Sequence, residues 1–279
     1  MDLLHFPDGE IRAILKDDVS GKQAVIVQSL GKKPNEYLVE AFLMADALRR
    51  AGARKIILAC PYLAYSRQNL PETDGASLAA RLFAYFLHEV GISELIALDL
   101  HAEHIPSFYD FPVHHLSAKK LLCDKAKKKI HGASSHLVVV GPDLGSAKLV
   151  ASYAEEFQTS FALIQKRRLG PRQVESLSLV GEVEGKDVLL ADDMCSTAHT
   201  LVSAAHICRE KGAKKIYASI THGLFVEKAL ELIEASPIEH LFVTDSCCPD
   251  TALLSSSKVE VVSCAPLFAQ AIEVCAHAM

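Results

Sequence analysis

The sequence predicts an α/β fold, and three observations lead to it. Short runs rich in leucine or β-branched residues alternate with longer amphipathic segments, which is the pattern of parallel strands connected by helices. Gly52 and Gly212 each stand where a predicted helix should end, and a new strand begins just beyond each of them. Polar stretches follow the strands, and ligands of open α/β sheets bind beyond the carboxyl ends of the strands.

The predicted elements form two series with the same plan. The first has strands at 24–30, 55–62 and 94–101 and helices at 36–52 and 77–91. The second has strands at 136–143, 161–166, 187–193, 215–223, 240–246 and 259–264 and helices at 146–157, 199–213 and 266–279. A lysine-rich helical segment at 119–135 separates them, so we predict two domains, 1–133 and 134–279.

Composition narrows the class of protein. A chain of 279 residues buries a core without metals or disulfides, and its eight cysteines, with no C-x-x-C pair, are expected to be free thiols that offer no zinc framework. No apolar run approaches the ~20 residues of a membrane span, and the N-terminus has no signal-peptide features, so we expect a cytoplasmic protein. The net charge of −5 argues against a nucleic-acid binder.

The stretch "VLLADDMCSTAHT" is the most informative one. Residues 188–191 read as a buried strand, so Asp192 and Asp193 should emerge at its carboxyl end, followed by small hydroxyl residues at a helix N-terminus. Adjacent carboxylates can accept hydrogen bonds from sugar hydroxyls, and the helix N-terminus can hold a phosphate. Alternatively, Ser196 or Thr197 simply caps the helix while the aspartates complement its dipole. The residues alone leave both interpretations open.

Several dispersed motifs resemble the phosphoribosyl-pyrophosphate synthetases, or ribose-phosphate diphosphokinases. "DDMCSTAHT" and "GAKKIYASITHG" resemble the ribose-phosphate site of that family, and counterparts to other motifs occur in the same order along nearly the whole chain. These are "FPDGE", "CPYLAYSRQN", "ALDLHAEHI", "FYDFPVHHL", "GPDLGSAK" and "KRR". Ser196, "PYLAY" and the short length look most like the archaeal-type members. The resemblance implies two similar phosphoribosyltransferase-like domains.

The resemblance also implies a reaction and the residues that perform it. The family transfers a diphosphoryl group from ATP to the 1-hydroxyl of ribose 5-phosphate, with Mg²⁺, and its members form homo-oligomers. By likeness, the residues that contact ATP are Phe6, Asp8, Gly9, Glu10, Arg67 and Gln68. Those that contact ribose 5-phosphate are Asp192, Asp193, Ser196, Thr197, Ala198, His199 and Thr200. The metal ligands are His101 and Asp143, with Asp99 and His104 as nearby alternatives to His101. The catalytic cations are Lys166 and Arg168 on a basic loop.

Some features depart from the family pattern. Family members have a strand and a helix before the "FPDGE" loop, so the first domain should lack both. His199 stands where the family usually has glycine, and an imidazole there could obstruct the phosphate or bind it. Asn69 replaces an aspartate and Ser146 replaces a glycine. Two alternatives therefore accompany the enzyme: a non-catalytic regulatory homologue and a phosphoribosyltransferase.

Overall fold

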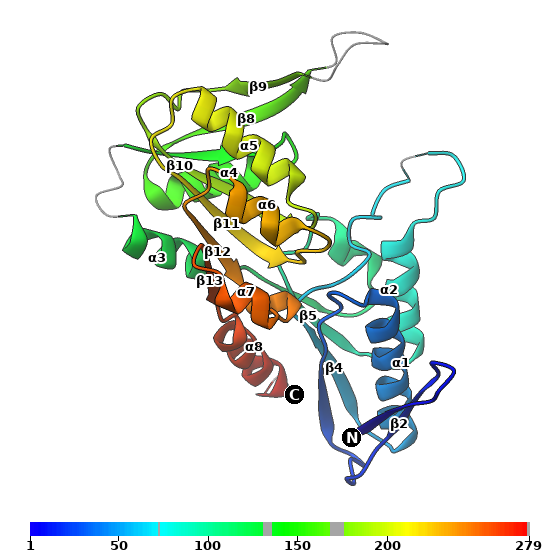
Figure 1. Cartoon of the computed structure of the whole chain (residues 1–279). Helices are drawn as coiled ribbons and strands as arrows, with labels where there is room; N and C mark the ends of the chain where they lie inside the picture. Colours follow the sequence, from blue (N-terminus) through cyan, green and yellow to red (C-terminus); the bar gives the residue numbers. More distant parts are fainter. Residues whose placement is uncertain (72, 131–135, 168–175, 278–279) are drawn as a thin grey trace. The chain divides into compact units, whose positions relative to one another are not determined.

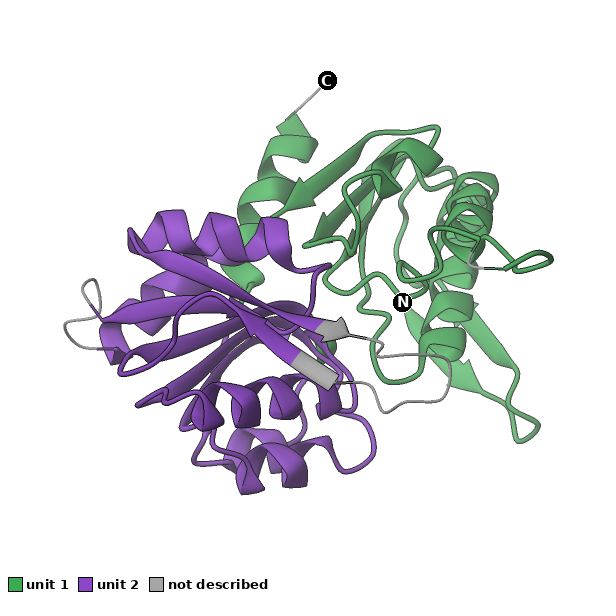
Figure 2. Cartoon of the chain, turned by 90° about the horizontal axis from the view of Figure 1, so that it is seen from above, with its two compact units in different colours: residues 1–117, 246–248, 264–279 green, residues 118–245, 249–263 purple. Residues whose placement is uncertain are grey.

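The computed structural model describes residues 1–71, 73–130, 136–167 and 176–277 (Figure 1). The chain divides into two compact units (Figure 2). Unit 1 contains residues 1–117, 246–248 and 264–279, and unit 2 contains residues 118–245 and 249–263. Each unit contains a mainly parallel sheet flanked by helices, which confirms the predicted fold class.

Unit 1 is built on a four-stranded parallel sheet in the order β3-β4-β5-β6. Its strands are β3 (Gln23–Val27), β4 (Lys55–Cys60), β5 (Glu94–Leu98) and β6 (Val113–Leu116). Its helices are α1 (Pro34–Arg50), α2 (Ala79–Glu89), the 3-10 helices η1 (Ile105–Phe108) and η3 (Asp245–Cys247, whose first residue belongs to unit 2), and α8 (Ala265–His277). Strand β4 is buried almost throughout because its run of apolar residues is covered on both faces.

Unit 2 is built on a seven-stranded sheet in the order β13-β12-β11-β10-β7-β8-β9, in which only β8 and β9 pair antiparallel. Its strands are β7 (Leu137–Gly141), β8 (Ser160–Arg167), β9 (Ser176–Val180), β10 (Asp187–Cys195), β11 (Ile216–Gly223), β12 (His240–Thr244) and β13 (Val259–Val262). Its helices are α3 (Lys119–Lys129), α4 (Ala147–Phe157), α5 (His199–Glu210), α6 (Ala229–Ala235) and α7 (Thr251–Ser255).

Helix ends follow the glycine signals. Helix α1 begins with Pro34, whose missing N–H costs nothing in the first turn, and ends before Gly52 at φ 79°. Helix α5 ends before Gly212 at φ 86°. Both glycines adopt the left-handed conformation that terminates a helix without a Cβ clash, as predicted.

The boundaries of the compact units do not fall at residue 133, where the sequence predicted the first domain to end. Helix α3 packs against α4 and strands β11, β12 and β13 of unit 2, because its lysines face outward and its apolar side buries Leu122, Cys123 and Ala126. Helix α8 packs against β5 and β6 of unit 1. Sequence order alone does not reveal that α3 packs in unit 2 and α8 in unit 1, since both helices have the same amphipathic pattern as their neighbours.

No helix in the described part of the chain is both long enough and apolar enough to cross a membrane.

Candidate functional site

Carboxylates gather at the carboxyl edge of the unit 2 sheet. Asp143 follows β7, Asp192 lies near the end of β10, and the two strands pair in parallel with Leu190 opposite Val140. Burial, and then the nearby charges of Asp193 and Asp143, raise the pKa of Asp192 to about 8. The site therefore holds a carboxyl group that keeps its proton at neutral pH unless a cation or hydrogen-bond donors stabilise its charge.

The aspartate pair lies inside the strand rather than beyond it, which corrects the predicted strand end at residue 191. Strand β10 continues to Cys195 because β11 continues beside it, with Asp192 opposite Ile220 and Met194 opposite His222. Successive strand residues face opposite sides of a sheet, so Asp192 shares the face of Val188 and Leu190 in the core beneath α5. The Asp193 N–H donates to Asp192 Oδ1 at 2.9 Å.

Ser146 fixes the exposed Asp143 beyond β7. The Ser146 N–H donates to Asp143 Oδ1 at 3.0 Å, and its hydroxyl donates to the Asp143 carbonyl at 2.7 Å. One carboxylate oxygen is thus held by the backbone while the other stays available. The serine that replaces a family glycine therefore orients the aspartate, which was not foreseen from the sequence.

The loop from Ser196 to Ala198 leads into the N-terminus of α5. Ala198 precedes the helix with φ 64° and is buried, and no described side chain caps the helix. This result contradicts the alternative in which Ser196 or Thr197 only caps α5. His199 and Thr200 are exposed in the first turn, so backbone N–H groups and a hydroxyl can receive an anion there.

Backbone groups after β11 hold this loop in place. The Leu224 N–H donates to the Cys195 carbonyl at 2.9 Å, and the Val226 N–H donates to the Ser196 carbonyl at 3.0 Å. This support was not predicted from the sequence. The signal that could have indicated this support is that the adjacent strands β10 and β11 both have polar residues near their ends.

One of the two predicted catalytic cations lies within the described residues. Lys166 lies in β8, where its backbone is opposite Leu177 of β9. Arg168 lies outside the described residues.

The "FPDGE" motif forms the exposed turn of a hairpin between β1 (Asp2–His5) and β2 (Ile11–Ile14) in unit 1. The Phe6 N–H donates to the Glu10 carbonyl, the Glu10 N–H donates to Asp8 Oδ1, and Gly9 has φ 94°. Gly9 meets no heavy atom within 4 Å of an added Cβ, so this position needs glycine for its backbone conformation rather than for space. The side chain of Phe6 is 45% exposed and is free to stack on a planar ring.

Arg67 and Gln68 are exposed in the segment after β4. Their neighbour Asn69 is buried and donates from its side-chain amide to the Ser66 carbonyl at 2.7 Å. The asparagine that replaces a family aspartate is therefore part of the turn that presents Arg67. This segment and the β1–β2 hairpin both lie against the N-terminal part of α1, because the Tyr65 hydroxyl donates to Asn35 Oδ1 and His5 Nε2 is 3.7 Å from Glu40 Oε1.

His101 is exposed in the segment after β5. This segment is held by His115, whose Nε2 accepts from the Leu100 N–H at 2.9 Å. It lies beside Asn69, because His104 Nε2 is 3.4 Å from the Asn69 carbonyl oxygen. Unit 1 thus brings His101 and Arg67 to the same edge of its sheet.

Family models match both parts of the chain. The N-terminal domain of ribose phosphate pyrophosphokinase matches residues 1–91. A domain described as phosphoribosyl synthetase-associated matches residues 167–278.

Curated relatives match over nearly the full length. Ribose-phosphate pyrophosphokinase from Fusobacterium nucleatum is 35% identical over 98% of this chain and 85% of its own. The protein of the same name from Aquifex aeolicus is 36% identical over 96% of this chain and 85% of its own. The crystal structure of phosphoribosylpyrophosphate synthetase from Mycobacterium smegmatis superposes with a TM-score of 0.92 at 31% identity, covering 98% of this chain and 89% of that chain.

Proposed function

The chain belongs to the ribose-phosphate pyrophosphokinase family, and from this premise we propose that it transfers the diphosphoryl group of ATP to the 1-hydroxyl of ribose 5-phosphate. The anomeric oxygen forms a bond to the β-phosphorus and gives up its proton to solvent, the bond from that phosphorus to the α,β-bridging oxygen breaks, and AMP leaves. Such a reaction depends mainly on alignment and on neutralising developing negative charge.

The ribose 5-phosphate site is assigned to unit 2. The observation that carries this assignment is the half-buried Asp192 beside a loop that opens onto the uncapped N-terminus of α5. The loop N–H groups, with Ser196, Thr197 and Thr200, hold the 5-phosphate. The carboxylates of Asp192 and Asp193 accept hydrogen bonds from the sugar hydroxyls, which stabilises the charged form of Asp192.

The residues at this edge also fit a divalent cation. Asp193 and Asp143 lie close enough to raise the pKa of Asp192, and carboxylate oxygens are the ligands that Mg²⁺ prefers. We propose Asp143 and His101 as the residues that hold Mg²⁺. When bound, Mg²⁺ would neutralise phosphate charge and hold the phosphates in line.

The ATP site is assigned to unit 1. Arg67 is exposed after a buried strand and can form bidentate contacts with phosphate oxygens, while Gln68 supplies a further polar contact. Phe6 stacks on the purine, and Asp8, Gly9 and Glu10 present polar groups around it. Lys166 and Arg168 stabilise the charge on the transferring phosphates.

The β1–β2 hairpin ends in an exposed turn, residues 6–10, which is accessible to another copy of the chain. We propose a homo-oligomer in which the hairpin of one copy serves the nucleotide site of another. Analytical ultracentrifugation that finds only monomers at working concentrations, with full activity, contradicts this proposal. A cytoplasmic location remains a prediction from the sequence.

The decisive test is a purified-protein assay with ATP, ribose 5-phosphate and Mg²⁺ that follows AMP release. The enzyme releases AMP only when ribose 5-phosphate is present. A regulatory homologue would bind nucleotide without AMP release, and a phosphoribosyltransferase would instead consume phosphoribosyl pyrophosphate with a base. An Asp192→Asn variant should lose the AMP signal while keeping its circular dichroism spectrum.

A further inference from the structure

A second cluster of ligating side chains lies at the opposite edge of the unit 1 sheet from Arg67 and His101. Glu94 is the first residue of β5, and His114 is near the start of β6. Cys275 reaches them from α8, which packs on these two strands. The cluster therefore lies at the amino ends of the strands, and none of its residues is among those assigned above to ATP, sugar phosphate or Mg²⁺.

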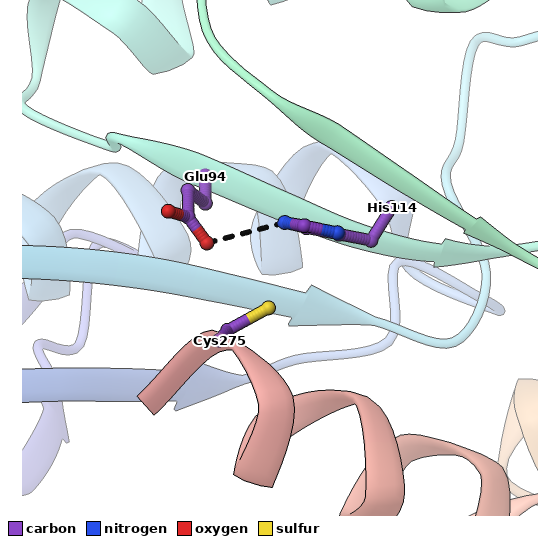
Figure 3. Close-up of side chains that lie close together, drawn as sticks. All are labelled: Glu94, His114 and Cys275. Atoms are coloured by element: carbon purple, nitrogen blue, oxygen red, sulfur yellow. Dashed lines mark hydrogen bonds and ion pairs between the residues drawn. The ribbon is translucent and has the colours of Figure 1, made fainter. Parts of the chain in front are cut away.

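The three ligating groups converge closely. Their ligand atoms all lie within 4.8 Å of one another, and His114 Nε2 is 3.2 Å from Glu94 Oε2. Figure 3 shows the Cys275 sulfur directed toward this pair. In a tetrahedral site the ligand atoms are roughly 3.3–3.8 Å apart, given bonds of about 2.0–2.3 Å. Shifts of about 1 Å would therefore complete the geometry.

The three side chains together favour one class of metal ion. Thiolate and imidazole select borderline or soft transition metals over Mg²⁺, and a carboxylate commonly completes such a site. We propose that Glu94, His114 and Cys275 bind a divalent transition metal ion of the Zn²⁺ class, with water as the fourth ligand. Binding releases the thiol proton to solvent.

Lys55 orients this site without occupying it. Its ammonium group lies 2.6 Å from Glu94 Oε1 and donates to the Cys275 carbonyl at 3.0 Å. The ion pair thus holds one carboxylate oxygen and leaves Oε2 directed at His114, as outer groups do around metal ligands. The positive charge of Lys55 opposes a second cation, but the thiolate formed on binding offsets it.

Solvent can reach the cluster from the imidazole side. The side chain of His114 is 38% exposed, whereas that of Glu94 is 15% exposed and Cys275 is buried. An ion can therefore enter past His114. Once bound, it fastens the C-terminal helix α8 to β5 and β6, so the metal should stabilise unit 1 rather than take part in phosphoryl chemistry.

Cobalt titration tests the proposal directly. Untagged, EDTA-treated protein is titrated with Co²⁺ in excess Mg²⁺, which fills oxygen-only sites and gives no signal. A thiolate-to-cobalt absorption band that saturates at one equivalent is expected, and Zn²⁺ should abolish it by competition. Absence of the band in the wild-type protein overturns the proposal.

Matched variants locate the ion. Cys275→Ser should remove the band, while Cys248→Ser, which alters the exposed cysteine of the same unit, should leave it unchanged. His114→Asn changes a partly exposed side chain and should fold even if Cys275→Ser does not. We expect at least about a tenfold loss of cobalt affinity in this variant, and wild-type affinity would contradict the site. Because the readout is metal binding, failure here leaves the AMP-release assay unaffected.

Discussion

Leu190 of β10 lies opposite Val140 of β7 in a parallel pair, and this register brings the carboxylates of Asp192 and Asp143 to one edge of the unit 2 sheet. The two side chains come from segments far apart in the sequence. When Asp192 is ionised, the folded protein carries the free-energy cost of their mutual repulsion and of the burial of the charge. A ligand that neutralises this charge relieves part of the repulsion, and this relief should strengthen its binding.

The raised pKa of Asp192 predicts how the stability of the metal-free protein depends on pH. Between its ordinary value of 3.8 and about 8, the native carboxyl group holds a proton that the unfolded one has lost. Stability falls with rising pH wherever the native state binds more protons, so Asp192 should lower the free energy of unfolding progressively from about pH 4 to about pH 8.

Substitution isolates this contribution. Asp192→Asn should be more stable than the wild type at pH 8 and close to it at pH 4, measured by urea unfolding in EDTA. Asp187→Asn, in the same strand, is the control and should show the wild-type pH dependence. Equal stability differences at both pH values for Asp192→Asn would show that this carboxyl group titrates normally.

Ala198 provides a second prediction, because three energies compete at its φ of 64°. Substitution by glycine relieves about 1–2 kcal/mol of left-handed strain. It also costs roughly 0.4–1 kcal/mol through the freer unfolded chain and about 0.8 kcal/mol for the lost buried methyl. These terms nearly cancel, so Ala198→Gly should change the free energy of unfolding by less than about 1 kcal/mol.

A helical alanine gives the contrast. Ala204 is buried in the middle of α5, where glycine has no strain to relieve and costs about 1 kcal/mol in propensity alone. Ala204→Gly should therefore be more destabilising than Ala198→Gly by about 1–2 kcal/mol in chemical denaturation. Equal losses in the two variants would mean that Ala198 carries no strain.

The parallel strands were readable from sequence because buried strands such as 55–60 and 137–141 are continuous apolar runs. The β1–β2 hairpin was not predicted, because its strands have only four residues each and none of these residues is buried, so no alternation stands out. The family resemblance, rather than periodicity, identified its turn as a candidate nucleotide contact.

The sequence also did not show which segments, far apart along the chain, lie together in the fold. Glu94, His114 and Cys275 have no spacing that suggests a cluster, and only the docking of α8 brings the cysteine to the sheet. Similarly, the length of β10 depends on its neighbour β11, so the end of the strand could not be read from residues 188–195 alone. Asp143 and Asp192 were predictable because each follows or ends a strongly apolar strand.

Lys166 should be required for turnover but not for folding. Removing one positive group that stabilises transition-state charge typically costs about 10²–10³ in kcat, so Lys166→Ala should lower steady-state AMP formation by at least two orders of magnitude, as should Arg168→Ala. Lys211→Ala, an exposed lysine after α5, is the charge-matched control and should retain activity. Full activity in Lys166→Ala would exclude this side chain from catalysis.

Leu122 tests whether α3 belongs to unit 2. Its side chain is fully buried, and α3 packs on α4 and on strands β11 to β13. Leu122→Ala should cost about 2–5 kcal/mol through lost burial and the cavity left behind. Hydrogen exchange should then accelerate in α3 and β11–β13 while β4 and β5 of unit 1 keep their protection. Lys120→Ala, at a side chain that is 78% exposed, should leave exchange unchanged in both units. Faster exchange in β4 and β5 of Leu122→Ala, with β11–β13 unaffected, would instead assign α3 to the first unit.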